Sequence, residues 1–483
     1  ANLVGSETLN LSGTGTIASK DVGSSKTVTV GTLALADGSN GGLAANYTLT
    51  GGTHQLTVNQ RPLNATLARQ YDGTTNAAGS TLSSLDALQG GETLTMTGSG
   101  TAASANVANG ITMSSNGNLA LANGTGAASN YSLNSTVINI AKRVLNSSGS
   151  KTYDANTNAL AADITLSNLV SGEALNHSGT ATIGSPNAAS YTISNLSGIT
   201  IADGSGGAAS NYTLTGGTHN FTVNRRVVGV SGTRLYDATT NAVASDLSTH
   251  ANLVGSETLT LSGTGTIASK DVGSNKTVTV GTLALADGSN GGLAANYTLT
   301  GGTHQLTVNQ RPLNATLARQ YDGTTASAGS TLSSFDALQG GETLTMTGSG
   351  TAASANVANG ITMSSNGNLA LADGTGAASN YSLNSTVINI AKRVLNSSGS
   401  KLYDANTNAL AGAITLSNLV SGEALNHSGT ASTSSANVGS YTISNLTGIT
   451  IADGSGGTAS NYTLTGGTHN FAINQRPLNA TLA

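Results

Sequence analysis

The sequence predicts an all-β protein built as a tandem array of small domains. Three observations lead to this fold class: a repeat of about 82 residues, a composition rich in strand-forming Thr, Val, Leu, Ile and Tyr, and an alternation of apolar and polar positions within each repeat. The chain has 483 residues. This length exceeds what one hydrophobic core supports and suits several domains of about 50 to 200 residues each.

Two nested repeats organise the chain. The longer has a period of 250 residues, since residues 1–75 recur as 251–325 with two changes, Asn10 against Thr260 and Ser25 against Asn275. The shorter is marked by two dipeptides. Tyr-Asp pairs begin at Tyr71, Tyr153, Tyr236, Tyr321 and Tyr403, in steps of 82, 83, 85 and 82 residues. Asn-Tyr pairs keep a fixed phase to them and end at Tyr47, Tyr131, Tyr212, Tyr297, Tyr381 and Tyr462.

A basic residue opens each Tyr-Asp segment, and these openings set the predicted boundaries: Arg61, Arg143, Arg226, Arg311, Arg393 and Arg476. The predicted domains are a truncated repeat at 1–60, complete repeats at 61–142, 143–225, 226–310, 311–392 and 393–475, and the start of a further repeat at 476–483. We expect the natural chain to continue beyond both ends.

The first strand signal is KTVTVGTLALADG (26–38), where apolar residues alternate at Val28 and Val30 and again at Leu33 and Leu35. This period of two is typical of a half-buried strand. The second is NYTLTGGTHQLTV, whose two alternating halves flank a Gly-Gly turn and predict a β-hairpin.

A third segment, STLSSLDALQGGE, spaces Leu82, Leu85 and Leu88 three apart and predicts a short helical turn ended by Gly90. Long helices are not expected. A repeat of this size can bury about 60 to 65% of its unfolded surface, enough for a small β-sandwich or β-grasp-like domain. A continuous parallel β-helix is the alternative, but it requires coils of about 20 residues that resemble one another, and each marker dipeptide occurs once per repeat.

Composition excludes several partners. Charged residues make up 8% of the chain, and the net charge of -4 comes with no polybasic run, so we expect no nucleic-acid partner. No apolar run reaches about 18 residues, so we expect no membrane insertion. The chain has no Cys, which excludes disulfides and thiolate metal sites.

Short motifs recur in a fixed order along the repeats: KTYDANTNAL, GGETLTMTGSG, KDVGSSKTVTV, LALADGSN and NYTLTGG. In this order they resemble the YDG-type repeat region of filamentous-haemagglutinin-like surface adhesins of Gram-negative bacteria. The resemblance covers essentially the whole chain. It implies secretion by a partner transporter, an extracellular location at the bacterial cell surface, and a role in adhesion, aggregation or biofilm. It also implies that the repeats form a stalk, with an unknown host or matrix receptor bound elsewhere.

No residue is predicted to be catalytic, cofactor-binding or metal-ligating, and we expect no enzyme activity. The seven His residues are scattered, and four share one Gly-Gly-Thr-His turn: His54, His219, His304 and His469, apart from His177, His250 and His427. A zinc site needs about four converging ligands. No Gly-x-Ser-x-Gly elbow accompanies the abundant Ser and Thr.

Acidic residues pose two alternatives. LADGSNGG at Asp37 and IADGSGG at Asp203 faintly resemble the Gly- and Asp-rich coils that bind calcium. Asn123 replaces the Asp in one repeat, so the preferred interpretation is a turn that the Asp side chain stabilises. All Glu residues share one phase: Glu7, Glu92, Glu173, Glu257, Glu342 and Glu423. Each is expected to pair with Lys or Arg of a repeat opening, the alternative being a cation site with the Tyr-Asp carboxylate.

The Tyr-Asp tyrosine is predicted to pack near the boundary within its own repeat, while Asp72 caps the turn at Gly73 and Thr74. Replacing Tyr153 with Ala is then expected to unfold its own repeat alone. Only Tyr191 and Tyr441 lie outside the recurring pairs, which leaves few aromatic platforms for sugars. The predicted function is a structural stalk. The alternatives are a self-associating matrix or filament protein and a glycan-binding module.

Overall fold

A computed structural model describes residues 2–443 and 445–480. The described residues form β-strands and short 3-10 helices, with no α-helix among them. The chain divides into two compact units, Ala1–Arg226 and Val227–Ala483. The predicted all-β tandem array is confirmed, and the sheets do not close into a continuous helix.

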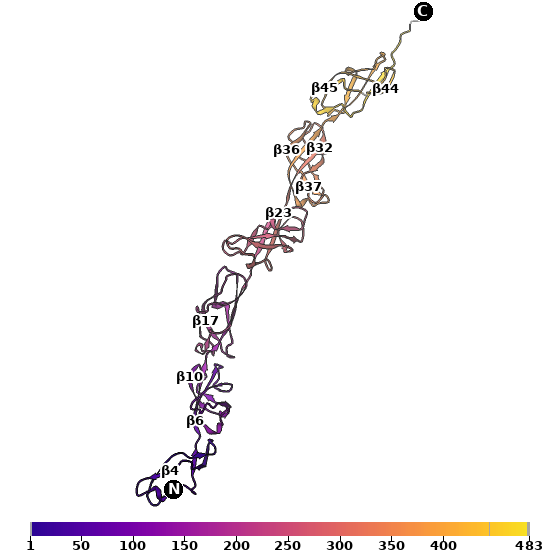
Figure 1. The fold of residues 1–483 in the computed structure, drawn as a ribbon. Helices are drawn as coiled ribbons and strands as arrows, with labels where there is room; N and C mark the ends of the chain where they lie inside the picture. Colours follow the sequence, from indigo (N-terminus) through magenta and orange to yellow (C-terminus); the bar gives the residue numbers. More distant parts are fainter. Residues whose placement is uncertain (1, 444, 481–483) are drawn as a thin grey trace. The chain divides into compact units, whose positions relative to one another are not determined.

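The repeat at 61–142 has a five-stranded sheet in the order β7-β6-β12-β10-β9 and a separate two-stranded ribbon, β8 with β11. Its first and last strands lie parallel, with Leu67 opposite Ile138. Figure 1 marks β6 and β10 within this repeat. The strands are β6 (Arg61–Gln70), β7 (Thr81–Leu85), β8 (Leu94–Thr97), β9 (Thr101–Ala102), β10 (Ala108–Ser115), β11 (Ala120–Asn123) and β12 (Tyr131–Ala141).

The repeat at 311–392, in the second unit, has the same arrangement: β33-β32-β38-β36-β35 with the ribbon β34–β37. Its strands are β32 (Arg311–Gln320), β33 (Thr331–Phe335), β34 (Leu344–Thr347), β35 (Thr351–Ala352), β36 (Ala358–Ser365), β37 (Ala370–Asp373) and β38 (Tyr381–Ala391).

The repeat at 143–225 has three sheets, β16-β14-β21-β18, β15-β17-β19 and β13-β20. Its first and last long strands, β14 and β21, are again parallel. The strands are β13 (Arg143–Val144), β14 (Asn146–Thr152), β15 (Asn158–Leu160), β16 (Ile164–Ser167), β17 (Leu175–Thr182), β18 (Ser190–Thr192), β19 (Ile199–Asp203), β20 (Tyr212–Thr213) and β21 (His219–Asn224).

The repeat at 393–475 repeats this pattern in the second unit, with β42-β40-β47-β44, β41-β43-β45 and β39-β46. Its strands are β39 (Arg393–Val394), β40 (Asn396–Leu402), β41 (Asn408–Leu410), β42 (Ile414–Ser417), β43 (Leu425–Ser432), β44 (Gly439–Thr442), β45 (Ile449–Asp453), β46 (Tyr462–Thr463) and β47 (His469–Asn474).

The remaining repeats carry the KDVG segment. Residues 1–60 form β2-β3-β5 and β1-β4, and the second unit begins with β24-β27-β28-β31-β23-β25 and β26-β29. The strands are β1 (Leu9–Ser12), β2 (Thr16–Ile17), β3 (Gly23–Thr29), β4 (Ala34–Asp37), β5 (Gln55–Val58), β22 (Arg226–Val227), β23 (Gly229–Leu235), β24 (Asn241–Val243), β25 (Thr249–Ala251), β26 (Leu259–Ser262), β27 (Thr264–Ile267), β28 (Gly273–Thr279), β29 (Ala284–Asp287), β30 (Tyr297–Thr298) and β31 (His304–Asn309).

Short 3-10 helices come immediately before the tyrosine of each Asn-Tyr pair and so place that ring. They are η1 (Ala44–Asn46), η2 (Ala128–Asn130), η4 (Ala209–Asn211), η6 (Ala294–Asn296), η7 (Ala378–Asn380) and η9 (Ala459–Asn461). Three more lie elsewhere in the repeats: η3 (Ala161–Asp163), η5 (Ala244–Asp246) and η8 (Ala411–Ala413).

Alternation along the strands builds the core. In β6, every second residue faces inward, and Leu63, Ala65 and Leu67 are buried while Asn64 is exposed. The buried side chains meet those of β12, where Ile138 and Ile140 are fully enclosed. The period of two in the sequence therefore reports the buried face of a sheet.

Two local predictions were wrong. The segment 46–58 is not a hairpin, because its second half is β5, which pairs with β3, and the stretch after Tyr47 is not a strand. The segment predicted as a helical turn is the strand β7, whose Leu82 and Leu85 lie opposite Leu67 and Ala65 of β6.

Candidate functional site

The residues of the Tyr-Asp and Asn-Tyr pairs meet at the junctions between consecutive repeats. In the second unit, the Tyr321 hydroxyl donates to Oε1 of Glu423 at 2.6 Å, and the Tyr462 hydroxyl donates to Oε2 at 2.6 Å. Tyr321 belongs to one repeat, whereas Glu423 and Tyr462 belong to the next. One carboxylate thus joins two tyrosines from neighbouring repeats.

The first unit contains the same arrangement. Tyr71 donates to Glu173 at 2.6 Å, and Tyr212 donates to the other carboxylate oxygen at 2.7 Å. The two rings meet edge to face with centroids 5.4 Å apart, as do Tyr321 and Tyr462. This geometry is favourable for aromatic pairs, because the positive edge of one ring faces the negative face of the other.

The tyrosines are part of an apolar cluster that continues across the junction. Tyr321 is 5% exposed and packs with Leu317 and Ile390 of its own repeat and with Leu395 and Leu425 of the next. The predicted burial of the Tyr-Asp tyrosine is confirmed at this position. The expectation that it packs within its own repeat is wrong, because its cluster belongs to both repeats.

A buried asparagine adds a second polar contact to the junction. Asn461 is 1% exposed; its Oδ1 accepts the backbone N–H of Val357 at 2.8 Å, and its Nδ2 donates to Oδ1 of Asn356 at 2.9 Å. Asn211 does the same with Val107 and Asn106 in the first unit. The amide thereby satisfies a main-chain donor of the preceding repeat.

The predicted pairing with a basic residue of a repeat opening was wrong for Glu92, Glu173, Glu342 and Glu423. The glutamates accept hydrogen bonds from tyrosines, while the opening Arg143 and Arg393 reach the backbone oxygens of Tyr71 and Tyr321, both at 3.4 Å. At two junctions a lysine of the KDVG segment contacts the glutamate: Lys20 pairs with Glu92 at 2.6 Å, and Lys270 pairs with Glu342.

Burial and hydrogen bonding shift the ionisation of these groups. Burial, followed by the hydrogen bond to Glu423, raises the pKa of Tyr462 to about 12. Burial and the Glu173 contact raise the pKa of Tyr71 to about 12 as well. Burial opposes ionisation of Glu342, yet hydrogen bonds from Lys270 and two tyrosines hold its pKa below the ordinary value. At neutral pH, each tyrosine is a protonated donor to its carboxylate.

The aspartate of the Tyr-Asp pair has a separate role. Its predicted cap is confirmed, since Oδ1 of Asp72 accepts the backbone N–H of Thr74 at 2.9 Å. It also forms an ion pair with Arg69, and Asp322 pairs with Arg319 at 2.6 Å. The basic residue and the aspartate therefore close their own turn.

The Asp-Gly segments are closed by the aspartate side chain. Oδ1 of Asp203 accepts the backbone N–H of Ala209 at 2.7 Å, and Asp37 does the same with Ala44 at 2.7 Å. Asn123 fills the equivalent place with Ala128 at 2.8 Å. The predicted turn stabilised by the aspartate side chain is confirmed, although its hydrogen bond closes a loop longer than a tight turn.

The histidines of the Gly-Gly-Thr-His turns are structural. His219 is 5% exposed, with Nδ1 at 2.9 Å from the Ser147 hydroxyl and Nε2 at 2.8 Å from the Leu214 oxygen. In the part of the chain that the structure describes, no three His, Asp or Glu side chains gather as metal ligands. Tyr191 and Tyr441 are half-buried and donate to main-chain oxygens of their own repeats.

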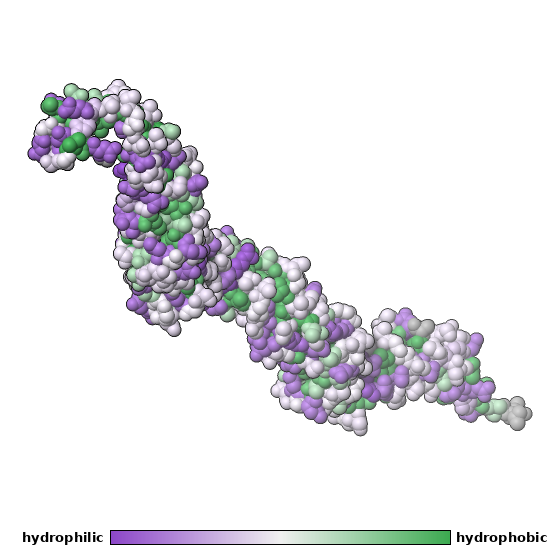
Figure 2. All heavy atoms as spheres, turned by 90° about the horizontal axis from the view of Figure 1, so that it is seen from below, coloured by the Kyte–Doolittle hydropathy of each residue, from purple (hydrophilic) through white to green (hydrophobic). Residues whose placement is uncertain are grey.

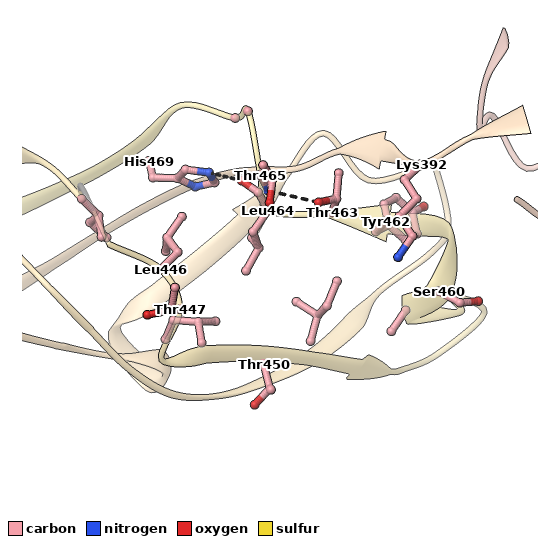
Figure 3. Close-up of a pocket in the computed structure, with 16 residues that line it drawn as sticks. Lys392, Leu446, Thr447, Thr450, Ser460, Tyr462, Thr463, Leu464, Thr465 and His469 are labelled. Carbon is pink, nitrogen blue, oxygen red and sulfur yellow. Dashed lines mark hydrogen bonds between the residues drawn. The ribbon is translucent and has the colours of Figure 1, made fainter.

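A surface cavity of 740 Å³ lies in the repeat at 393–475 and is lined by Leu446, Leu464, Thr447 and Lys392, among others. Figure 3 shows the His469 ring on one side of it, bonded to the Leu464 oxygen at 2.7 Å. Tyr462 on its wall is already engaged with Glu423. The two polar rings on its wall, Tyr462 and His469, therefore already have partners within the fold.

These features define the class of the protein: a tandem array of small β-domains in which a shared Tyr-Glu-Tyr contact joins consecutive repeats. The chain belongs to the YDG domain family, whose model matches residues 1–56, 53–138, 141–219, 222–308, 304–388 and 391–469. The match covers most of the chain, and the six segments follow the repeat period.

Other comparisons add little. No curated protein matches the chain. Among solved structures, "The Bacillus anthracis TIE protein" is aligned at 8% identity over 80% of this chain and 74% of that chain, with a TM-score of 0.14. That score is too low to indicate a shared fold. None of the described residues form a helix of the length and apolarity that crossing a membrane requires.

Proposed function

We propose that this chain is a structural spacer in a large bacterial surface adhesin of the filamentous-haemagglutinin type, located outside the cell. Its repeats hold a receptor-binding region, placed elsewhere, away from the cell surface. The role requires no catalysis. The observation that carries the proposal is the buried junction, where Glu423 binds a tyrosine from each of two repeats. Such a contact couples neighbouring domains and suits a load-bearing array.

The sheet edges favour a spacer over a laterally polymerising matrix. In the repeat at 61–142 the edge strands β7 and β9 have 5 and 2 residues, and in the next repeat β16 and β18 have 4 and 3. Short edge strands offer few unpaired main-chain groups to another chain. On the face shown in Figure 2, exposed hydrophobic residues form small patches among hydrophilic ones.

Sedimentation velocity of the purified chain, combined with small-angle scattering, tests the proposal. A spacer gives a monomer whose sedimentation is independent of concentration and whose scattering is that of an elongated particle. Fibres that grow with concentration would instead support a matrix protein, and a compact particle would contradict both. Saturable binding on a glycan array would move the function to a glycan-binding module.

A further inference from the structure

The junctions within the two units are of two chemical kinds. In the hydroxyl joint, defined by Tyr71–Glu173 and Tyr321–Glu423, the carboxylate accepts from tyrosines and has no ion-pair partner among the described residues. In the ion-paired joint, defined by Lys20–Glu92 and Lys270–Glu342, a lysine of the preceding repeat contacts the glutamate of the next.

In the ion-paired joint of the second unit, Lys270 contacts both the glutamate and a tyrosine. Lys270 pairs with Glu342, donates to the Tyr236 hydroxyl at 2.8 Å and lies 5.5 Å from the centre of that ring. The Glu342 side chain is 8% exposed, whereas Lys270 is 40% exposed. The lysine side chain is therefore partly open to solvent and its ions, while the carboxylate is enclosed.

The two joints share one framework and differ in two neighbouring residues, since Nδ2 of Asn380 donates to Asp271 at 2.9 Å where Nδ2 of Asn461 donates to Asn356 at 2.9 Å. In the ion-paired joint, Asn380 accepts the backbone N–H of Val272 at 2.9 Å, just as Asn461 accepts that of Val357 at 2.8 Å in the hydroxyl joint. Lys270 lies two residues before Val272, and the residue two before Val357 is Ala355. Lys270 and Asp271 thus replace Ala355 and Asn356 on a common framework, and of the two added charges it is the lysine that contacts the junction glutamate.

We propose that Lys270 and Lys20 make the ion-paired joint dependent on ionic strength, so that salt loosens this joint and leaves the hydroxyl joint closed. The proposal rests on the proposed spacer function and gives the array two kinds of joint. Salt shortens the Debye length from about 30 Å at 0.01 M to about 3 Å at 1 M and weakens the attraction between partly exposed charges. Hydrogen bonds from a neutral hydroxyl to an enclosed carboxylate depend on contact and are screened much less.

Amide hydrogen exchange measures each joint directly, because the N–H groups of Val272 and Val357 are bonded across their junctions. Between about 0.01 M and about 1 M sodium chloride, exchange at Val272 is expected to accelerate about two- to fivefold, the range that a partly exposed ion pair supports. Exchange at Val357 is expected to stay constant. An equal response of the two amides would overturn the proposal.

A loss-of-function variant has a matched control in the same chain. Lys270→Ala is expected to abolish the salt response at Val272. Val22, whose N–H donates to Asn130 at 2.8 Å in the Lys20 joint, is expected to keep its own response. The two segments can be told apart by mass, because Ser25 stands where the other copy has Asn275. A salt response that persists at Val272 in the variant would refute the role of the lysine.

The converse variant tests a gain of function. Ala355→Lys is expected to confer a salt response on Val357, while Val107 in the unaltered first-unit joint stays insensitive. An unresponsive Val357 in this variant would also refute the proposal. Failure of the spacer function is seen separately, as fibres or a compact particle in sedimentation and scattering.

Discussion

The junction tyrosine gives the sharpest test of the structure, because the chain contains both a buried and an exposed copy of it. Tyr321 is 5% exposed, whereas Tyr403 is 38% exposed. Removing a buried aromatic side chain costs about 3 to 5 kcal/mol. A repeat of about 82 residues has a total stability of about 4 to 12 kcal/mol at the usual stability per residue. Tyr321→Ala is therefore expected to bring its junction close to unfolding.

The same substitution at Tyr403 is the matched control and is expected to cost about 1 kcal/mol or less, because the ring is partly in water before the change. Limited proteolysis with fragment mapping distinguishes the two variants. Tyr321→Ala is expected to open cleavage sites in both 311–392 and 393–475, since its cluster includes Leu395 and Leu425 of the second repeat. Equal protease resistance of the two variants, or cleavage confined to 311–392, would refute the shared cluster.

Three further outcomes follow from named contacts. Asp203→Asn is expected to cost less than about 0.5 kcal/mol in chemical unfolding, because Asn123 makes the equivalent bond natively, whereas Asp203→Ala is expected to cost about 1 kcal/mol. The folded pKa of about 12 for Tyr71 and Tyr462 lies above the unfolded value of 10.0. The stability contributed by these two protonated tyrosines is therefore complete below about pH 10 and is lost as the pH rises through 12. A melting temperature that stays constant from about pH 9 to about pH 12 would contradict this pH dependence. EDTA is expected to leave the melting temperature unchanged, because Asp37 already accepts a backbone N–H. A large drop in melting temperature with EDTA would instead support calcium binding at the Asp-Gly segments.

The sequence predicts what depends on local periodicity and misses what depends on distant pairing. Strands were found because alternation is visible within a few residues. The hairpin was wrong because in these repeats the last strand pairs in parallel with the first: Ser147 lies opposite His219, 72 residues later. The leucines three apart were misread because a bulge between Thr66 and Leu67 shifts the register, so Leu82 and Leu85 both remain half-buried in one strand.

The residues of the candidate site could be identified from the sequence, but the contacts between them could not. The single phase of the glutamates and the two tyrosine pairs were visible, and these are the residues that meet. Their contact was missed because partners were sought within one repeat, whereas Tyr71 and Glu173 are 102 residues apart. That separation is one repeat plus about 20 residues. A search for recurring polar residues at one repeat length plus a constant would have found the pair.

This spacing has a consequence for how the array can grow. At three junctions within the units, a glutamate of one repeat accepts a hydrogen bond from a tyrosine of the repeat before it: Glu173 from Tyr71, Glu342 from Tyr236 and Glu423 from Tyr321. Duplicating any whole number of repeats therefore copies both halves of the joint, and the new boundary has a donor, an acceptor and an edge-to-face ring pair in place. A neutral hydroxyl also suits this role, because it satisfies an enclosed carboxylate without burying a second charge. The 250-residue period, in which residues 1–75 recur with two changes, is the product expected of such a duplication.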